Sequence, residues 1–338
     1  MEFLFEYGLF LAKAITIVGA FVVIVGVIAG AAMKQKPAKG QLEFTSLSEQ
    51  IDDLKQYATE MLLNKDELKK QNKEKKKKAK QDKKSEEKKS RLFVIDFNGS
   101  MDANEVESLR EEVTAVLCAA DKDDEVLVRL ESGGGVVHGY GLAASQLQRF
   151  KDKSLALTVS VDKVAASGGY MMACVADNVI AARFAIIGSI GVIAQLPNFN
   201  KLLKKHDIEY EQHTAGQFKR TLTVFGENND EGREKFREEL EEVHVMFKSF
   251  VSDNRPDLDI DSVATGEYWY GAKAKALGLV DQIGTSDDYL LSKVESHDIF
   301  SVKYKTRKNV AEKLGIASAN IVERVTSRMW EKSQQWFR

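Results

Sequence analysis

The stretch from Glu125 to Phe150 reads EVLVRLESGGGVVHGYGLAASQLQRF and combines three local patterns. Its first seven residues form the short, apolar-rich run typical of a buried strand, and Val137 to Phe150 is predicted to be a helix. Three glycines, Gly133 to Gly135, lie between the two. A strand that leads through a tight glycine turn into a helix is the building unit of α/β folds. This stretch therefore predicts an α/β domain.

The same alternation of strands and helices continues on both sides of this stretch. Expected strands are 92–97, 125–131, 155–161, a short strand near Val179, and 208–213. Expected helices are 102–120, 137–150, 166–176 and 229–254. Strands and helices that alternate at this spacing indicate an α/β domain with right-handed crossovers, from about residue 91 to 300.

Composition excludes several classes of protein. The 338 residues include 49 basic and 51 acidic side chains, and 43% are apolar, which is enough for a sizeable core. A net charge of −2 does not fit a uniformly basic nucleic-acid-binding protein, so no nucleic-acid partner is expected. Two cysteines, Cys118 and Cys174, are too few for a disulfide scaffold or a four-cysteine zinc site. The five histidines are scattered, so a histidine metal centre is not expected either.

Residues 1–40 are predicted to form a membrane anchor and a short linker. Residues 14–33 read AITIVGAFVVIVGVIAGAAM, about the length of a helix that spans the ~30 Å hydrocarbon core of a bilayer. A cleaved signal peptide is the alternative, supported by the small residues at 29–32. The long apolar run, and the acidic Glu2 and Glu6 before it, favour a retained single-pass anchor.

Residues 41–90 are predicted to form a helical, Lys-rich linker. Leu47, Ile51, Leu54, Ala58 and Met61 recur with heptad steps, which predicts either a helical pairing surface or a plain amphipathic helix. Residues 64–91 contain 14 Lys or Arg against 6 Asp or Glu. Such a run suits contact with anionic lipid or nucleic acid, but a solvated linker is the simpler interpretation.

The glycine loop Glu131-Ser132-Gly133-Gly134-Gly135 is the first candidate for chemistry. Glycines at a strand–helix junction let backbone N–H groups approach an anion closely. The loop matches neither GxGxxG nor GxxxxGK[ST], so a nucleotide site is weakly supported. A tight turn that needs a positive φ explains the loop about as well.

The second candidate is the stretch 165–173, AASGGYMMA, in which Ser167 precedes an apolar helix. Unpaired N–H groups and the helix dipole favour negative charge at that position. An exposed hydroxyl beside such N–H groups suits a serine nucleophile. A serine that only caps the helix is the structural alternative.

A serine nucleophile needs a base, and the residues alone leave two candidates. His138 is the only histidine close to either glycine motif, but no spacing identifies an acid that would orient it. Lys219 lies in Gly216–Leu222, where flanking apolar side chains favour the neutral amine that a base requires. Local sequence does not select Lys219 among the many other lysines.

Taken together, these motifs resemble the signal peptide peptidase A family of serine peptidases, and most of all its short inner-membrane type with one N-terminal anchor. The matching segments follow the family's order along nearly the whole chain: anchor, charged linker, ESGGG, AASGGYMMACVAD at 165–177, IGSIGV at 187–192, then 214–221 and 268–281. The resemblance implies a fold related to the Clp protease and crotonase superfamily, a superhelix of ββα-like units. It implies a peptidase domain over 91–300, and a C-terminal helical extension is expected over 301–338.

The resemblance also implies roles for individual residues. Ser167 matches the nucleophile and Lys219 the general base of a Ser–Lys dyad, while Ser189 matches a serine that orients the lysine. Gly134 and Gly168 match the backbone N–H donors of the oxyanion hole. The implied reaction is peptide-bond hydrolysis through an acyl-enzyme, with no metal or organic cofactor.

Gly133 is a departure from the family, which commonly has proline at this position. The two donor glycines remain, so the resemblance still implies an oxyanion hole. Without the proline ring, however, the loop is less restrained.

The resemblance implies homo-oligomers, because short members of the family assemble subunits to complete a ring of active sites. The other expected partners are peptide or protein substrates and the membrane lipid around residues 14–33. Two further classes of protein stay open: a crotonase-like acyl-CoA enzyme, which shares the fold, and a non-catalytic membrane scaffold.

The charges around the span and the resemblance to the family predict opposite membrane sides for the catalytic domain. Lys13 precedes the span, whereas Lys34, Lys36 and Lys39 follow it closely. Because the side richer in Lys and Arg stays cytoplasmic, the charges favour a cytoplasmic catalytic domain at the bacterial inner membrane. Members of the family usually face the periplasm, which is the opposite expectation.

Overall fold

The computed structural model describes residues 7–11, 13, 16, 40–64, 67 and 89–305. The chain divides into two compact units, one of residues 1–41 with 305–338 and one of residues 42–304. The predicted anchor (except Thr16), most of the Lys-rich run, and the C-terminal extension from residue 306 lie outside the described residues. Within the described ranges, no helix combines the length and the apolar character that crossing a bilayer requires.

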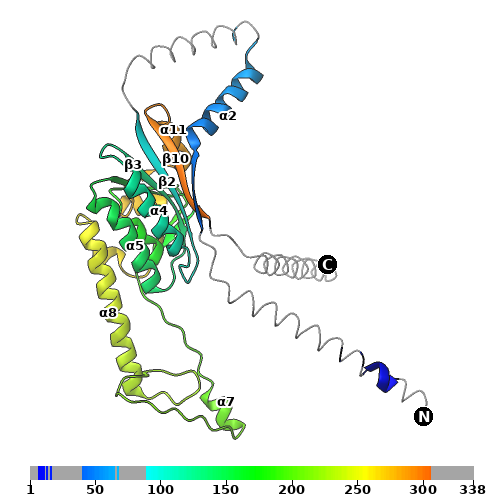
Figure 1. Ribbon diagram of the computed structural model, residues 1–338. Coiled ribbons are helices and arrows are strands. Elements are labelled where there is room, and N and C mark those ends of the chain that lie inside the picture. The colour runs from blue at the N-terminus through cyan, green and yellow to red at the C-terminus, as the bar shows by residue number, and fades with distance from the viewer. Residues whose placement is uncertain are drawn as a thin grey trace, which may run out of the picture. The chain divides into compact units, whose positions relative to one another are not determined.

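The larger unit is a mixed α/β structure around one sheet, as the alternation of strands and helices predicts (Figure 1). Its strands follow the order β1-β10-β2-β3-β4-β6-β9, and every pairing from β10 across to β9 is parallel. Their bounds are β1 Gln41–Ser46, β2 Ser90–Gly99, β3 Glu125–Ser132, β4 Ala156–Val161, β6 Asn178–Ala181, β9 Gln282–Ile283 and β10 His297–Lys305. Three short strands continue from β3 at its carboxyl end: β5 Val164–Ala166, β7 Ile186–Gly188 and the antiparallel β8 Tyr268–Tyr270.

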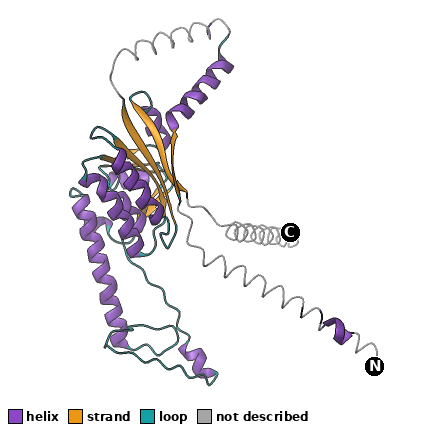
Figure 2. Ribbon diagram, viewed as in Figure 1, coloured by secondary structure: helices purple, strands orange, loops and turns teal. Residues whose placement is uncertain are grey.

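Helices cover both faces of the sheet. Figure 2 shows α4 (Val106–Ala119), α5 (Val137–Asp152) and α8 (Asp230–Asn254) grouped on one side of the strands. The side chains of β2 alternate, so that Phe93, Ile95 and Phe97 join the main core on that side. Leu92 and Val94 point the other way, into a smaller cluster with Leu290 of α11 (Ser286–Lys293). A run that is apolar at nearly every position is expected of such a doubly covered strand.

The register of the short strands brings three loops together. Ser132, the last residue of β3, is paired with Ala165 of β5. Ala166, the last residue of β5, is paired with Gly188 at the end of β7. The glycine loop, Ser167 and Ser189 therefore follow directly from three neighbouring parallel strands. Carboxyl ends of parallel strands are where α/β proteins commonly bind ligands.

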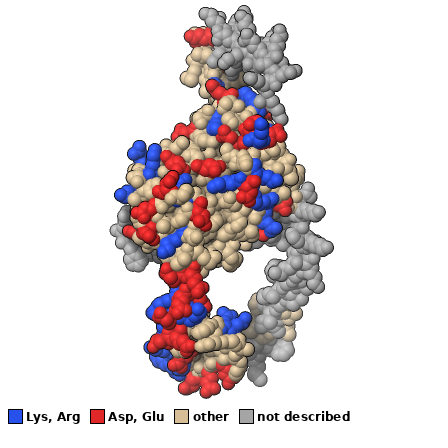
Figure 3. All heavy atoms as spheres, turned by 90° about the vertical axis from the view of Figure 1, so that its left-hand side faces the viewer, with Lys and Arg blue, Asp and Glu red and all other residues tan. Residues whose placement is uncertain are grey.

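Helix α8 carries a long loop away from the sheet. The helix has 25 residues and is therefore about 37 Å long. Asn229 caps its first turn by accepting a hydrogen bond from the N–H of Gly232, at 2.8 Å. We call residues 193–229 the arm; it includes α7 (Asn200–Lys205), which Figure 1 shows beside the N-terminal end of α8. Pairs such as Arg233–Asp230 and Arg237–Glu234 cover the exposed side of α8, where Figure 3 shows both charges interspersed.

The arm corrects one predicted element. Residues 208–213 were expected to form a strand, but they have no regular structure here. Their side chains are exposed, and they run beside the rest of the arm, held by contacts such as Tyr210 against Phe225, whose ring centroids are 5.8 Å apart. Alternating apolar and polar residues form a strand only where a neighbouring strand accepts the backbone hydrogen bonds.

Two predicted helical segments begin as strands. Residues 41–46 of the linker predicted to be helical form β1, and residues 301–305 of the predicted helical extension belong to β10, because both segments pair with the edge of the sheet. The other predicted elements within residues 91–300 are present with shifted ends. Helix 102–120 begins later, as α4 at Val106, and helix 166–176 is shorter, as α6 (Gly168–Ala173). The segment 268–281 forms β8, α10 (Gly271–Ala276) and the turn into β9. Residues 47–62 form α2, in which no residue is buried, so its role as a pairing surface stays a prediction. The short α9 (Ile260–Val263) follows α8.

Candidate active site

Ser167 lies in a strained turn between β5 and α6. Its φ of 52° and ψ of −119° fall in a region that residues other than glycine seldom adopt. The turn is fixed from both sides, because the N–H of Ser167 donates to Gly188 O at 2.7 Å and its carbonyl accepts from Met171 N at 3.0 Å. Such a sharp strand-to-helix turn leaves a serine hydroxyl exposed at the edge of a sheet, as in the nucleophile turn of α/β-hydrolases. Strain of this kind concentrates at functional sites.

The glycine loop packs directly on this turn. Gly134 has a φ of 85° and no room for a side chain, because a Cβ there would lie 2.8 Å from Ala166 O, Gly168 N and Ser167 Cβ. Gly168 is the first residue of α6, and its N–H is one of the helix's first donors, which have no intrahelical acceptor. The structure thus brings three of the predicted site residues, Ser167, Gly134 and Gly168, into contact.

Gly134 has a hydrogen-bond partner that local sequence did not suggest. Its N–H donates to Ser132 Oγ at 3.0 Å, and Ser132 Oγ lies 2.5 Å from the hydroxyl of Tyr140 on α5. The Tyr140 hydroxyl in turn donates to Ser100 O at 2.8 Å. Burial raises the pKa of Tyr140, so its hydroxyl stays protonated. Its ring packs on Gly168, where a Cβ would collide with it.

Ser189 lies next to Ser167 across the strands. It follows Gly188, the partner of Ala166, and the N–H of Ser167 donates to Gly188 O at 2.7 Å, so the two serines are neighbours. Ser189 also has a positive φ, 53°, and its N–H donates to Glu267 O at 2.6 Å. Its position beside Ser167 is compatible with the orienting role that the resemblance implies, and that role stays a prediction.

A small apolar pocket of about 80 Å³ opens beside Ser167. It has room for roughly one side chain, since whole small-molecule sites are several times larger. Its walls are Gly135, Val137, Gly168, Met171, Gly191, Val192, Ile193, Val243 and Phe247. The last two come from α8, and the mostly polar sequence of that helix does not indicate a contribution to a site.

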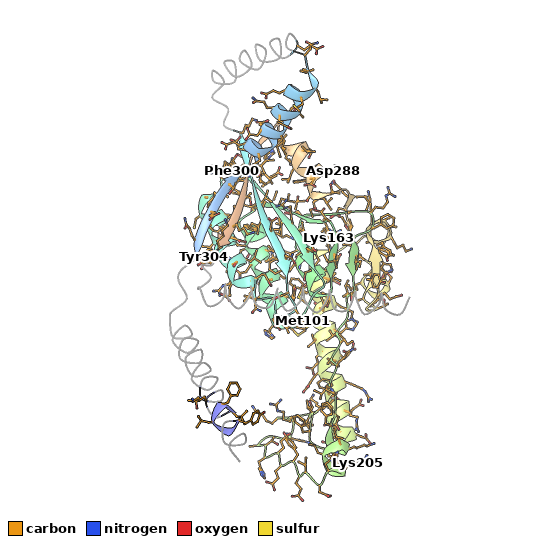
Figure 4. The ribbon with its side chains drawn as sticks, turned by 90° about the vertical axis from the view of Figure 1, so that its right-hand side faces the viewer. Met101, Lys163, Lys205, Asp288, Phe300 and Tyr304 are labelled. Carbon is orange, nitrogen blue, oxygen red and sulfur yellow. The ribbon has the colours of Figure 1, made fainter. Side chains whose placement is uncertain are left out.

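Lys219 lies elsewhere, on the arm. It is exposed and lines a different pocket, together with Tyr210 and Phe225. Its neighbours are fixed beside the start of α8: Gln217 donates to Glu231 at 3.1 Å, and Lys235 lies 5.8 Å from the ring centroid of Phe218. Figure 4 shows the extent of the arm, with Met101 at the body of the unit and Lys205 of α7 at the far end of the arm.

The length of α8 gives the scale of this separation. The arm segment that includes Lys219 lies beside residues 231–235, whereas the wall of the Ser167 pocket is formed by Val243 and Phe247. At 1.5 Å per residue, that offset is about 12–24 Å along the helix. A lysine side chain reaches only about 6 Å. The structure therefore does not bring Lys219 and Ser167 of one chain together.

The other candidate base, His138, is exposed in the first turn of α5. Its neighbour Val137 lines the Ser167 pocket, whereas His138 does not. Cys174 is the other intrinsic nucleophile near α6, but it is fully buried, and burial raises the pKa of its thiol to about 12. Cys174 is therefore a packing residue at neutral pH.

A partly buried ion pair and a tyrosine hydrogen bond hold α6 and α8 in place around the pocket. Arg255 makes two bonds to Asp281, at 2.8 and 2.7 Å, and the hydroxyl of Tyr170 donates to Leu279 O at 3.0 Å. Partial burial alone raises the pKa of Asp281, but the bonds from Arg255 and from Val179 N outweigh it and lower the pKa. Within the described ranges, no group of three His, Cys, Asp or Glu side chains is placed to hold a metal ion.

Two known sequence families match most of the chain. The family described as "peptidase family S49 N-terminal" matches residues 2–147, and the family described as "peptidase family S49" matches residues 149–299. The chain is 48% identical over 343 residues to a probable protease SohB of Haemophilus influenzae, covering 97% of each chain. It is 50% identical over 313 residues to a probable protease SohB of Buchnera aphidicola, covering 93% of each.

Among solved structures, the chain is similar to the 1510-N membrane-bound stomatin-specific protease, in a lysine-to-alanine mutant in complex with a substrate peptide. The TM-score is 0.42 at 11% identity, and the match covers 67% of this chain and 96% of that chain.

Proposed function

The chain belongs to peptidase family S49 and is a protease of the SohB type, and from this premise we propose that it is a membrane-anchored serine endopeptidase with a Ser–Lys dyad. Ser167 is the nucleophile and Lys219 the general base, with Ser189 orienting the lysine. Gly134 and Gly168 donate their N–H groups to the oxyanion. The observation that supports this most is the strained Ser167 turn, packed against the glycine loop beside an apolar pocket.

Lys219 reaches Ser167 from a second copy of the chain in this proposal. Within one chain the two residues line separate pockets. The arm exposes several large apolar side chains, among them Leu202, Ile208 and Phe225, and covering them would remove apolar surface from water. An arm that docks on a neighbouring copy buries such residues and delivers Lys219 to the neighbour's Ser167. The active protein is accordingly a homo-oligomer.

The reaction then proceeds in two halves. The neutral amine of Lys219 takes the proton of the Ser167 hydroxyl, and the oxygen attacks the carbonyl carbon of the substrate peptide. The N–H groups of Gly134 and Gly168 stabilise the oxyanion that forms. Lys219 gives its proton to the leaving amine, which leaves an acyl-enzyme on Ser167, and water activated by Lys219 releases the acid. The small pocket beside Ser167 favours an apolar substrate side chain next to the cleaved bond.

The proposal also includes a specific fold class, a membrane anchor and the side of the membrane on which the catalytic domain lies. The parallel sheet with its helical crossovers suits a Clp protease and crotonase-like superhelix of ββα units over residues 91–300. Residues 14–33 anchor the protein in the bacterial inner membrane, and the lysines after the span place the catalytic domain in the cytoplasm. Fusions of a fluorescent protein or of alkaline phosphatase to the C-terminus report the side directly; a dark fluorescent fusion with strong phosphatase activity would reverse the placement.

Covalent labelling tests the proposed function. A fluorophosphonate probe reacts with an activated serine, so the detergent-purified protein should be labelled at Ser167, and Ser167→Ala should not. The control is Ser145→Ala, which removes an exposed serine hydroxyl on α5. A crotonase-like acyl-CoA enzyme or a non-catalytic scaffold predicts no labelling of the native protein, so that result would refute a serine peptidase.

A further inference from the structure

A series of three hydrogen bonds holds the Gly134 amide, and the donor and the acceptor of each bond can be assigned. The Tyr140 hydroxyl has a single proton and donates it to Ser100 O at 2.8 Å. In its contact with Ser132 Oγ, at 2.5 Å, the Tyr140 oxygen is therefore the acceptor and Ser132 the donor. Ser132 Oγ still accepts a bond, and it takes the N–H of Gly134 at 3.0 Å.

The chain of bonds is enclosed. Ser132 is 2% exposed and Tyr140 fully buried. Gly99 leaves the space for this pair, because a Cβ there would lie 2.5 Å from the Tyr140 hydroxyl and 2.9 Å from Ser132 Oγ. Hydrogen bonds in a buried series strengthen one another. The Gly134 N–H is thus held by a fixed acceptor below the loop.

This bond competes with the proposed reaction, on which the present inference rests. An N–H directed at Ser132 Oγ is not directed at an oxyanion on Ser167. An interaction made in the free enzyme and lost in the transition state raises the barrier. We infer that Ser132 is a positioning residue that holds one of the two oxyanion donors away from the substrate, so that the Gly133–Gly134 peptide must turn as the oxyanion forms.

The loop is built to allow this turn. Rotating the peptide plane changes ψ of Gly133 and φ of Gly134, and glycine adopts a wide range of both. Gly133 has open space around it, with no atom within 4 Å of a Cβ placed there. A bond to a charged oxyanion is roughly twice as strong as a bond to a neutral hydroxyl, so the developing charge draws the N–H away from Ser132.

Replacing Ser132 with alanine tests the inference by a gain of activity. In the detergent-purified full chain, Ser132→Ala should raise kcat on a chromogenic peptide and the rate of fluorophosphonate labelling at Ser167 by about two- to tenfold, the range of one neutral hydrogen bond, with KM unchanged. Loss of a merely structural bond lowers these rates. The matched control is Ser160→Ala, a buried serine on β4 whose hydroxyl lies near Asp162, and it should keep native rates.

Hydrogen exchange provides a readout that does not depend on activity. The Gly134 amide, followed by mass spectrometry of the unreacted protein, should exchange faster in Ser132→Ala than in the native protein and in Ser160→Ala. Unchanged exchange of the Gly134 amide, or a kcat and a labelling rate equal to or below the native values, would overturn the inference. The proposed function would still stand in that case if Ser167 of the native protein is labelled. No labelling of the native protein would overturn the proposed function itself.

Discussion

Mixing two inactive variants should restore activity if the dyad forms between copies. Ser167→Ala and Lys219→Ala each remove one member of the dyad, and each should lose activity by about a thousandfold or more. The arm segment that includes Lys219 lies about 12–24 Å along α8 from the wall of the Ser167 pocket, beyond the ~6 Å reach of a lysine side chain. If each chain instead used its own serine and its own lysine, mixing the two variants would restore no activity, because each variant lacks one of the two groups.

The magnitude follows from counting sites in a mixed oligomer. At a one-to-one ratio, a site is complete when its serine comes from the Lys219→Ala chain and its lysine from the Ser167→Ala chain, which holds for roughly a quarter of the sites. The two variants, carrying different affinity tags, are co-expressed, purified through both tags and assayed on a chromogenic peptide. About a quarter of native activity per chain is expected.

A second mixture distinguishes the two arrangements independently. Native chains co-expressed with the Ser167→Ala, Lys219→Ala double variant retain roughly a quarter of the sites if the dyad spans two copies, and roughly half if it lies within one copy. Activity near half in this mixture, with none in the first, would refute the proposed exchange between copies. It would mean instead that the arm folds back on its own Ser167.

Three further substitutions test single features of the structure. Gly133→Pro should raise the free energy of unfolding by about 0.4–1 kcal/mol and leave turnover intact, because Gly133 has no positive φ and the preceding Ser132 is in a strand; a lower melting temperature would show that the loop does not accept the ring. Ser167→Gly should be more stable than Ser167→Ala by about 1–2 kcal/mol in thermal unfolding, since only glycine relieves a φ of 52°, and equal stability would mean that the turn is unstrained. Burial raises the pKa of Glu112 from 4.5 to about 7, so its proton stabilises the fold at low pH, and this stabilisation is lost as pH rises through 7. Glu112→Gln should therefore raise the free energy of unfolding by up to about 3 kcal/mol at pH 8 and by much less at pH 5. An equal effect at both pH values would contradict the raised pKa.

Local pattern predicted the central strands β2, β3, β4 and β6, but not β1, β5, β7 or β10. The apolar run of β2, the strand–glycine–helix sequence from Glu125 and the long polar helix from about 229 all appear where they were predicted. Residues 208–213 were predicted wrongly because strand formation depends on a partner strand, and the arm offers none. The order of the sheet, with β10 between β1 and β2, depends on contacts between distant residues that no local pattern contains.

Only part of the candidate site could be predicted from the sequence. Ser167, Gly134, Gly168 and Ser189 are found together because they lie just beyond the carboxyl ends of three neighbouring parallel strands. Two of these strands, β5 and β7, are only three residues long and were not predicted from the sequence. Ser132 and Tyr140 gave no signal, since a serine and a tyrosine eight residues apart are common in any strand and helix. The position of Lys219 depends on where an exposed arm rests, which sequence motifs do not encode.

Helix α8 keeps Lys219 about 12–24 Å along its length from the Ser167 pocket, and under the proposed function this has a consequence for the cell. A newly made chain that holds its base out of reach of its own serine is harmless while it is alone. In the proposed homo-oligomer, hydrolysis begins only when copies meet, so the separation itself keeps a single chain inactive. Activity then depends steeply on how densely the protein accumulates, and a membrane that concentrates the copies becomes the trigger for proteolysis.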